Sequence, residues 1–175
     1  MLRLVVAILL VSITAPILAE DTALVFGGTG RLGAPIVSRL VDAGYSVSVF
    51  VRPTSKRERL EGLDVAYVVG DLKDGEGMRA ALGGQKFGFV IDASAKDRGE
   101  VGFYNRSMSN MLAALGDSQV RQFILHGSVG AGDNMKNFPD VPFGRMEATL
   151  KAKGEAEDML RDSGITYTII RNGLI

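Results

Sequence analysis

A glycine-rich run near the start of the chain has the residue types and spacing of a phosphate-binding turn. The run is Gly27-Gly28-Thr29-Gly30-Arg31-Leu32-Gly33, which follows the apolar segment 23–26 and precedes a helical pattern. Gly27 would permit a tight exit from a strand, Gly30 would let the backbone approach a pyrophosphate, and Gly33 would let the helix pack closely. Backbone N–H groups at a helix start also favour phosphate oxygens. We therefore predict a dinucleotide site that includes Thr29, Arg31 and Leu32; the alternative is a glycine turn without a ligand.

A basic cluster follows the second predicted strand, where such a fold normally selects its cofactor. An acidic residue there would bond the ribose hydroxyls of NAD, but this chain has Arg52, followed by Ser55-Lys56-Arg57. An arginine can place two parallel hydrogen bonds on a 2′-phosphate. The cluster favours NADP over NAD, with Arg52 as the main contact. The alternative is a solvated basic loop.

Three polar residues in the second half of the chain could take part in chemistry. His126, the only histidine, lies near the end of the fifth predicted strand, where active sites of such sheets lie. It could donate a proton, or it could be a partly buried histidine that serves packing. Ser128 could orient a carbonyl or form a turn, and Lys153 could be functional or simply solvated.

The remaining candidates have plainer interpretations. Asn105 could be an active-site residue or a polar residue at a helix start. We interpret the acidic residues Glu155, Glu157 and Asp158 as a solvated helix face. We interpret the methionines at 108, 111, 146 and 159 as core residues.

The elements that must position these residues alternate between strand and helix. Apolar, β-branched runs predict strands at 23–26, 45–51, 65–69, 87–91, 121–125 and 166–170. Helical spacing predicts helices at 31–43, 78–82, 103–115 and 145–162. Strands that are apolar throughout indicate a parallel sheet with helices on both faces. We therefore predict an α/β, doubly wound parallel sheet of the Rossmann type with about six strands.

Length and composition limit the possible functions. The 175 residues fit one domain, which we place at 20–175, and the 20 basic and 20 acidic residues give no net charge. This balance argues against nucleic-acid binding. The absence of cysteine excludes disulfides and thiolate metal ligands, and a single histidine excludes a histidine-rich metal site, so no metal is expected.

The first 19 residues have the pattern of a secretory signal peptide. Arg3 gives a basic start, 4–14 is apolar or small, Pro16 breaks the helix, and Ala19 is a small residue before a predicted cut. This predicts a secreted or periplasmic protein without an integral membrane span in the mature chain. The alternatives are an uncleaved membrane anchor and a misassigned start codon, the latter giving a cytoplasmic protein.

These motifs together resemble a known superfamily. The Gly27, Gly30 and Gly33 spacing, the Val51-Arg52-Pro53 strand end and Gly70-Asp71-Leu72 are similar to short-chain dehydrogenase/reductases. More narrowly, they resemble the atypical, NmrA-like NAD(P)-binding branch. The segment 164–173 is similar to the last common strand and loop of that branch, where Arg-Pro-Gly is usual.

The resemblance implies roles for particular residues. Asp71 would meet the adenine amino group with Leu72 beside the ring, and Ala93 and Ser94 would pass beneath the ribose and pyrophosphate. Ser128 would be the catalytic serine. Lys153 would hold the nicotinamide ribose and complete the catalytic pair.

The chain departs from the family pattern in two places. The proton-donating tyrosine of the family would fall four residues before Lys153, where this chain has Thr149. A threonine hydroxyl is too weakly acidic for that task. Family members also continue beyond this point, so the C-terminal substrate part is expected to be absent, and a homo-oligomer or partner could complete the substrate site.

Two functions follow from the intact loop and the altered catalytic set. The first is an NADP(H)-dependent reductase that acts on a small acceptor such as a quinone, flavin or carbonyl. The second is a non-catalytic NADP(H)-binding or redox-sensing module. A third possibility, a protein that has lost the cofactor, is disfavoured by the intact glycines and Arg52.

Overall fold

The computed structural model describes residues 21–95, 100, 102–116 and 120–173. Its centre is one sheet of six parallel strands in the order β3-β2-β1-β4-β5-β6. The strands are β1 (Thr22–Phe26), β2 (Ser46–Val51), β3 (Val65–Val69), β4 (Phe89–Asp92), β5 (Gln122–Ser128) and β6 (Tyr167–Asn172). This is the strand order of dinucleotide-binding sheets, with the switch point between β1 and β4. The predicted α/β fold is confirmed.

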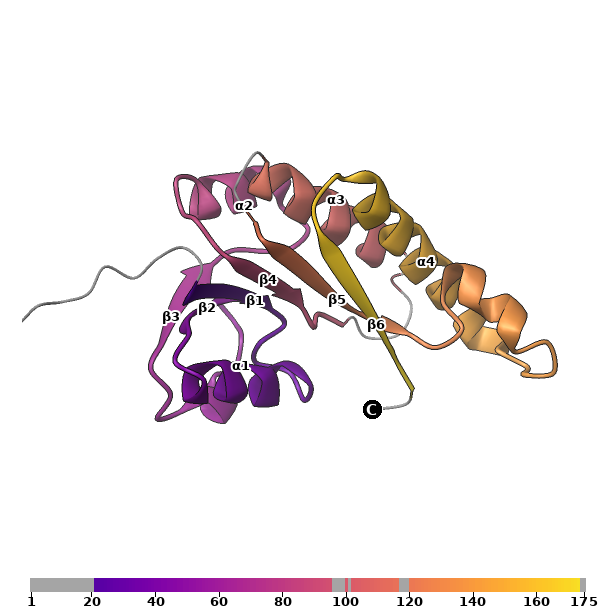
Figure 1. Cartoon of the computed structure of the whole chain (residues 1–175), viewed down its shortest axis with the longest axis horizontal. Helices are drawn as coiled ribbons and strands as arrows, with labels where there is room; N and C mark the ends of the chain where they lie inside the picture. Colours follow the sequence, from indigo (N-terminus) through magenta and orange to yellow (C-terminus); the bar gives the residue numbers. More distant parts are fainter. Residues whose placement is uncertain (1–20, 96–99, 101, 117–119, 174–175) are drawn as a thin grey trace, which may run out of the picture.

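The helices lie on two sides of the sheet, as Figure 1 shows. They are α1 (Gly33–Asp42), α2 (Gly75–Leu82), α3 (Phe103–Leu115) and α4 (Glu147–Asp162), with short 3-10 turns η2 (Glu58–Leu60), η3 (Gly132–Asn137) and η4 (Gly144–Met146). Helices α2, α3 and α4 cover one face, and α1 lies on the other. The glycine-rich run therefore leads from the central strand into the helix of the less covered face.

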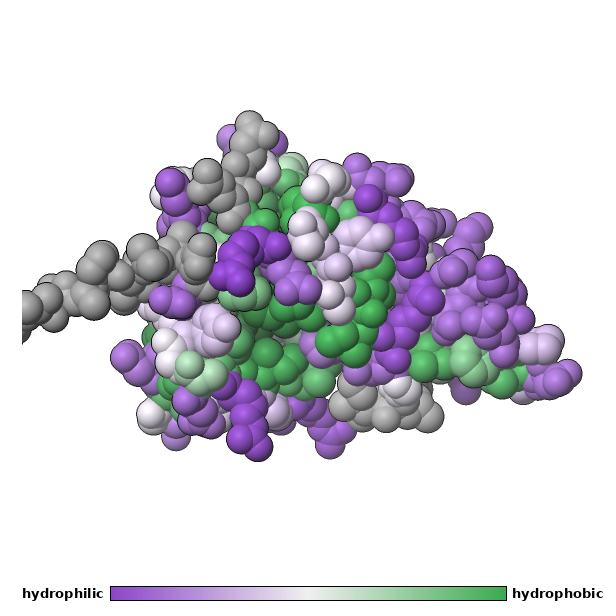
Figure 2. All heavy atoms as spheres, viewed as in Figure 1, coloured by the Kyte–Doolittle hydropathy of each residue, from purple (hydrophilic) through white to green (hydrophobic). Residues whose placement is uncertain are grey.

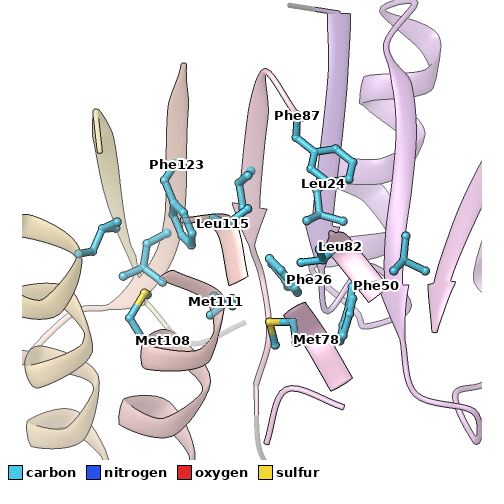
Figure 3. Packing of buried hydrophobic residues seen from close by; sticks show 14 of the residues in the cluster. Leu24, Phe26, Phe50, Met78, Leu82, Phe87, Met108, Met111, Leu115 and Phe123 are labelled. Atoms are coloured by element: carbon cyan, nitrogen blue, oxygen red, sulfur yellow. The ribbon is translucent and has the colours of Figure 1, made fainter. Parts of the chain in front are cut away.

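Two hydrophobic clusters explain why the strands are apolar throughout. Along β1, Leu24 and Phe26 belong to the cluster under α2, α3 and α4, whereas Ala23 and Val25 belong to the cluster under α1. All four side chains are fully buried. Figure 3 shows the larger cluster, in which Met78, Met108 and Met111 from the helices meet the phenylalanines of the strands. Burial on both faces accounts for an apolar strand without alternation.

The sheet is not covered by helices along its whole width. On the α1 side, the helix packs against β1 and β2, and no described helix covers the edge strand β6. Ile170 is 41% exposed there. Figure 2 shows hydrophobic residues gathered across the middle of this view, with hydrophilic residues beside them. The expectation of helices on both faces holds for the centre of the sheet and not for this edge.

Most predicted boundaries are close to those in the structure. The clearest difference is β5, which continues to Ser128 instead of ending at 125, because it pairs with β6 as far as Asn172. The predicted signal peptide, 1–19, lies outside the described residues. Among the residues that are described, no helix has the length and apolar character needed to cross a membrane.

Candidate dinucleotide site

A cleft of about 540 Å³ lies at the carboxyl edge of the sheet. It runs from the glycine loop and the end of β2, past β4, to the ends of β5 and β6. The lining includes every predicted site residue except Gly33: Gly27, Thr29, Gly30, Arg31, Leu32, Arg52, Asp71, Leu72, Ala93, Ser94, Ser128 and Lys153. This volume is within the usual range of cofactor pockets, roughly 300–1,000 Å³.

The glycine loop is held tightly against its neighbours. Gly27 has φ +71°, and a Cβ atom there would lie 2.6 Å from the carbonyl oxygen of Ala93. The N–H of Gly30 donates to the carbonyl of Gly27 over 2.9 Å. A Cβ on Gly33 would lie 2.2 Å from that same carbonyl, so Gly33 serves packing and does not line the cleft. Gly33 therefore allows the start of α1 to lie close to the loop.

The start of α1 leaves backbone donors available. No side chain in the described structure caps this helix, whose first residue is Gly33. The amide groups of a first helical turn have no partners within the helix, and their dipoles favour anions. The loop, the helix start and the cleft therefore fit a pyrophosphate.

One end of the cleft is basic. Arg52 and Ser55 form a turn after β2, in which the N–H of Arg52 donates to Ser55 Oγ over 3.1 Å and the N–H of Ser55 donates to the Arg52 carbonyl over 3.0 Å. Arg31 lines the same cleft. Among the described lining residues the one carboxylate is Asp71, which follows β3 and accepts the Lys73 N–H over 2.9 Å. No acid therefore stands at the end of β2.

The rest of the basic cluster has other roles. The Arg57 guanidinium lies over the Tyr67 ring, 4.3 Å from its centroid, and neither Lys56 nor Arg57 is among the lining residues. Arg59, which the sequence analysis did not single out, donates from Nη1 to the carbonyl of Thr29 over 3.3 Å. It ties η2 to the glycine loop, and no local pattern indicated this contact 30 residues away.

The other end of the cleft brings together polar groups from β5, β6 and α4. Lys153 Nζ donates to Ser128 Oγ over 2.7 Å and lies 5.1 Å from the centroid of the Tyr104 ring. His126 Nδ1 is 3.1 Å from Asn172 Nδ2. The predicted pair Ser128 and Lys153 is therefore in contact. Thr149, at the position of the family tyrosine, does not line the cleft.

Further lining residues came to light only in the folded chain. They are Phe50, Lys73, Phe103, Gly127, Met146, Asn172 and Gly173; the lining also includes Ser55 and His126, which the sequence had already indicated, and Ala95 next to Ser94. Most are apolar or small and follow a strand or begin a helix. Their position at the carboxyl edge of the sheet could have indicated them, but their residue types could not.

Burial shifts the titration of three groups around this end. Burial lowers the pKa of His126, although its contact with Asn172 acts in the opposite direction. Burial also lowers the pKa of Lys153, against the charges of Asp92 and Glu157. The pKa of Asp92 is raised by burial, against hydrogen bonds from Ser94 and the charge of Lys153. His126 is therefore a neutral imidazole at pH 7.

Two interpretations from the sequence need correction, and one alternative is decided. Glu157 is fully buried and accepts hydrogen bonds from Arg161 and Arg171, so it is not a solvated residue. Met146 and Met159 are 48% and 37% exposed, so they are not core residues. For Asn105 the structure favours the second alternative, a polar residue at a helix start, since its amide donates to Glu155 on α4 and it does not line the cleft.

Comparisons with known proteins agree with this geometry. Residues 27–175 match the family model described as NAD(P)H-binding. A relative is the NAD(P)H azoreductase of Xenophilus azovorans, 28% identical over 152 residues, which cover 86% of this chain and 47% of the relative. The chain thus spans about half the length of the curated relatives it matches.

Solved structures show the same fold at low identity. The oxidoreductase ylbE of Lactococcus lactis superposes with a TM-score of 0.71 at 21% identity, covering 86% of this chain and 68% of that one. The enzyme WbmG of Bordetella bronchiseptica, solved with NAD and UDP, gives 0.69 at 19% identity, with 85% and 52% covered. The glycine cradle, the strand order and the family match together show that this chain belongs to the NAD(P)H-binding family, in the atypical, NmrA-like group of short-chain dehydrogenase/reductases.

Proposed function

We propose that the protein is an NADP(H)-dependent reductase that transfers hydride to a small acceptor such as a quinone, flavin or carbonyl. The observation that carries this proposal is the charge distribution along one cleft. Arg31 and Arg52 line its adenosine end, and the Ser128–Lys153 pair lines the other. A bound nicotinamide dinucleotide would supply the hydride.

The preference for NADP rests on the end of β2. A 2′-phosphate needs donors and positive charge, which Arg52, Ser55 and Arg31 provide, whereas the ribose hydroxyls of NAD need an acceptor there. Asp71 is one strand further along and engaged with the Lys73 backbone. The site therefore favours the phosphorylated cofactor.

Reduction of an acceptor is supported by the far end of the cleft. Ser128 and Lys153 supply a hydroxyl and an ammonium group, and Phe103 and Met146 supply apolar walls for a flat molecule. The azoreductase relative is consistent with an acceptor of this kind.

Fluorescence titration of the purified protein with NADPH and NADH tests the cofactor, and NADPH consumption with a panel of quinones, flavins and aldehydes tests the reaction. We expect tighter binding of NADPH and turnover with at least one acceptor. Equal or tighter binding of NADH would refute the 2′-phosphate site.

The second candidate function is a non-catalytic NADP(H)-binding or redox-sensing module. The observation in its favour is Thr149, which replaces the usual tyrosine and lies outside the cleft lining. Tight NADPH binding without turnover by any acceptor in the panel would support this function over the first.

A further inference from the structure

A second, much smaller cavity of about 20 Å³ lies behind the far end of the cleft. Both cavities are lined by Ser94, His126, Gly127 and Lys153, so these residues form the wall between them. Asp92 and Ser107 are among the residues that line the small cavity but not the cleft. The volume is enough for about one water molecule.

Asp92 is an unusual group at this place. It is the last residue of β4, it is only 5% exposed, and its Oδ1 accepts the Ser94 N–H over 2.8 Å. A buried carboxylate is costly unless a cation or several hydrogen bonds compensate it. Lys153 is the cation that shares its cavity, and the charge of each favours the ionised form of the other.

The charge of Lys153 decides which way the Ser128 hydroxyl points. An ammonium group can only donate, so across the 2.7 Å contact Ser128 Oγ must accept and its own hydrogen is free to point into the cleft. A neutral amine could accept instead, and the hydroxyl hydrogen would then turn toward Lys153.

Other charged and titratable groups near Lys153 are already engaged. Glu157, one turn along α4, is paired with Arg161 and Arg171. On β5, His126 contacts Asn172, and on α3 the Tyr104 ring stacks against the ammonium. Asp92 is therefore the carboxylate best placed to hold the charge on Lys153.

We propose that Asp92 is a positioning residue that keeps Lys153 charged, and that the Lys153 ammonium is the acid whose proton reaches the acceptor through the Ser128 hydroxyl. The inference rests on the proposed reductase function. The acceptor would gain a hydride and the hydroxyl proton of Ser128. In the same step Ser128 Oγ would take a proton from Lys153 Nζ, so that no serine alkoxide forms. The resulting amine would regain a proton from water, so that the reaction consumes one proton for each hydride.

The test combines a titration that needs no turnover with a pH profile that does. In protein labelled with ¹³Cε-lysine, the Lys153 resonance, assigned by its loss in Lys153→Arg, reports its pKa directly. We expect Asp92→Asn to lower that pKa by about 1 unit. The fall of kcat/KM at high pH should move to lower pH by the same amount.

Two further variants distinguish a positioning role of Asp92 from a purely structural one. Ser107→Ala removes a hydroxyl from the same small cavity without changing charge, and we expect its titration and pH profile to match the wild type. Lys153→Arg keeps its charge at all pH values but cannot give up a proton, so we expect it to lose turnover across the whole pH range. This variant also tests the inference if Asp92→Asn does not fold.

Several results would overturn the inference. They are an unchanged Lys153 titration in Asp92→Asn, a uniform loss of activity across pH in that variant, or turnover that survives in Lys153→Arg. Absence of turnover in the wild type would refute the reductase proposal and the proton-donor role together. In that case a shifted Lys153 titration would still support the Asp92–Lys153 coupling.

Discussion

Arg52 is the residue whose replacement should separate the two cofactors. In the proposed site the Arg52 guanidinium bonds a 2′-phosphate that NADH lacks, so we expect Arg52→Ala to weaken NADPH binding by about 10-fold or more, as for a charge-assisted hydrogen bond. NADH binding should change little. Fluorescence titration with both cofactors measures the two dissociation constants.

Arg57 provides the matched control for this experiment. It is a neighbouring arginine of the same cluster, but its guanidinium stacks on Tyr67. We expect Arg57→Ala to leave the ratio of the two affinities unchanged. An equal effect of both substitutions would mean that only the general positive charge of the loop matters.

His126 should make the folded state sensitive to mild acid. Burial lowers the pKa of its imidazole below 6.5, so below that pH the unfolded chain binds a proton that the folded chain does not. The free energy of unfolding should therefore fall as the pH drops from 7 through 6.5 toward the folded pKa. Urea denaturation at pH 7.5 and at pH 5.5 measures this difference.

His126→Gln should remove that part of the pH dependence, since the chain has no other histidine. Asp92 acts with the opposite sign: its raised pKa lowers stability as the pH rises above 3.8. Its contribution cancels when the variant is compared with the wild type. A pH dependence identical in both proteins would contradict the assignment to His126.

At the level of elements, Glu157 joins α4 to β6. Its carboxylate accepts from Arg171 Nη2 over 2.6 Å and from Arg171 Nε over 3.2 Å, and Arg171 also contacts Asp133 of η3. We expect Glu157→Gln to lower the free energy of unfolding by about 1.5–3 kcal/mol, because the neutral amide loses the charge-assisted bonds to Arg161 and Arg171 while Arg171 keeps Asp133. Thermal and urea denaturation provide the measurement.

Asp158, the next residue of the helix, is the appropriate comparison. It pairs with Arg161 at the surface, where ion pairs contribute about 1 kcal/mol or less. Asp158→Asn should therefore cost far less than Glu157→Gln. Similar losses in both variants would show that α4 is not held to β6 through this carboxylate.

The elements themselves were largely predictable because their residue patterns are local. Strands buried on both faces, such as β1, appear in the sequence as short continuous apolar runs, and the glycines of the turn mark where α1 begins. The predicted residues of the loop, apart from Gly33, line the cleft as expected because strand, turn and helix are continuous in the sequence.

What could not be predicted depends on partners far along the chain. Glu157 has the charge and spacing of a solvated residue, and its burial depends on Arg171, 14 residues later, as well as on Arg161. Likewise, β5 extends to Ser128 because β6 pairs with it, and Asp92 is revealed as a site residue only by the cavity it shares with Lys153.

For the molecule as a whole, we propose that residues 1–19 direct export and are removed. Their basic start, apolar run and small residue at 19 support this proposal. In the native host, we expect the mature protein to begin at Glu20 and to be found outside the cytoplasm. Intact mass and amino-terminal sequencing of the isolated protein check both points; a cytoplasmic chain that retains residues 1–19 would contradict the proposal.

The cleft also draws its walls from both halves of the sheet, which bury two separate hydrophobic clusters on the two faces. A dinucleotide bound across the switch point would contact both halves of the sheet, and only the folded chain could bind it. At about 100 times its dissociation constant it would add about 2.7 kcal/mol to the free energy of unfolding, a roughly 100-fold drop in unfolded molecules. Proteases would then clear the empty protein faster than the loaded one, so the amount of this protein in its compartment would follow the supply of its cofactor.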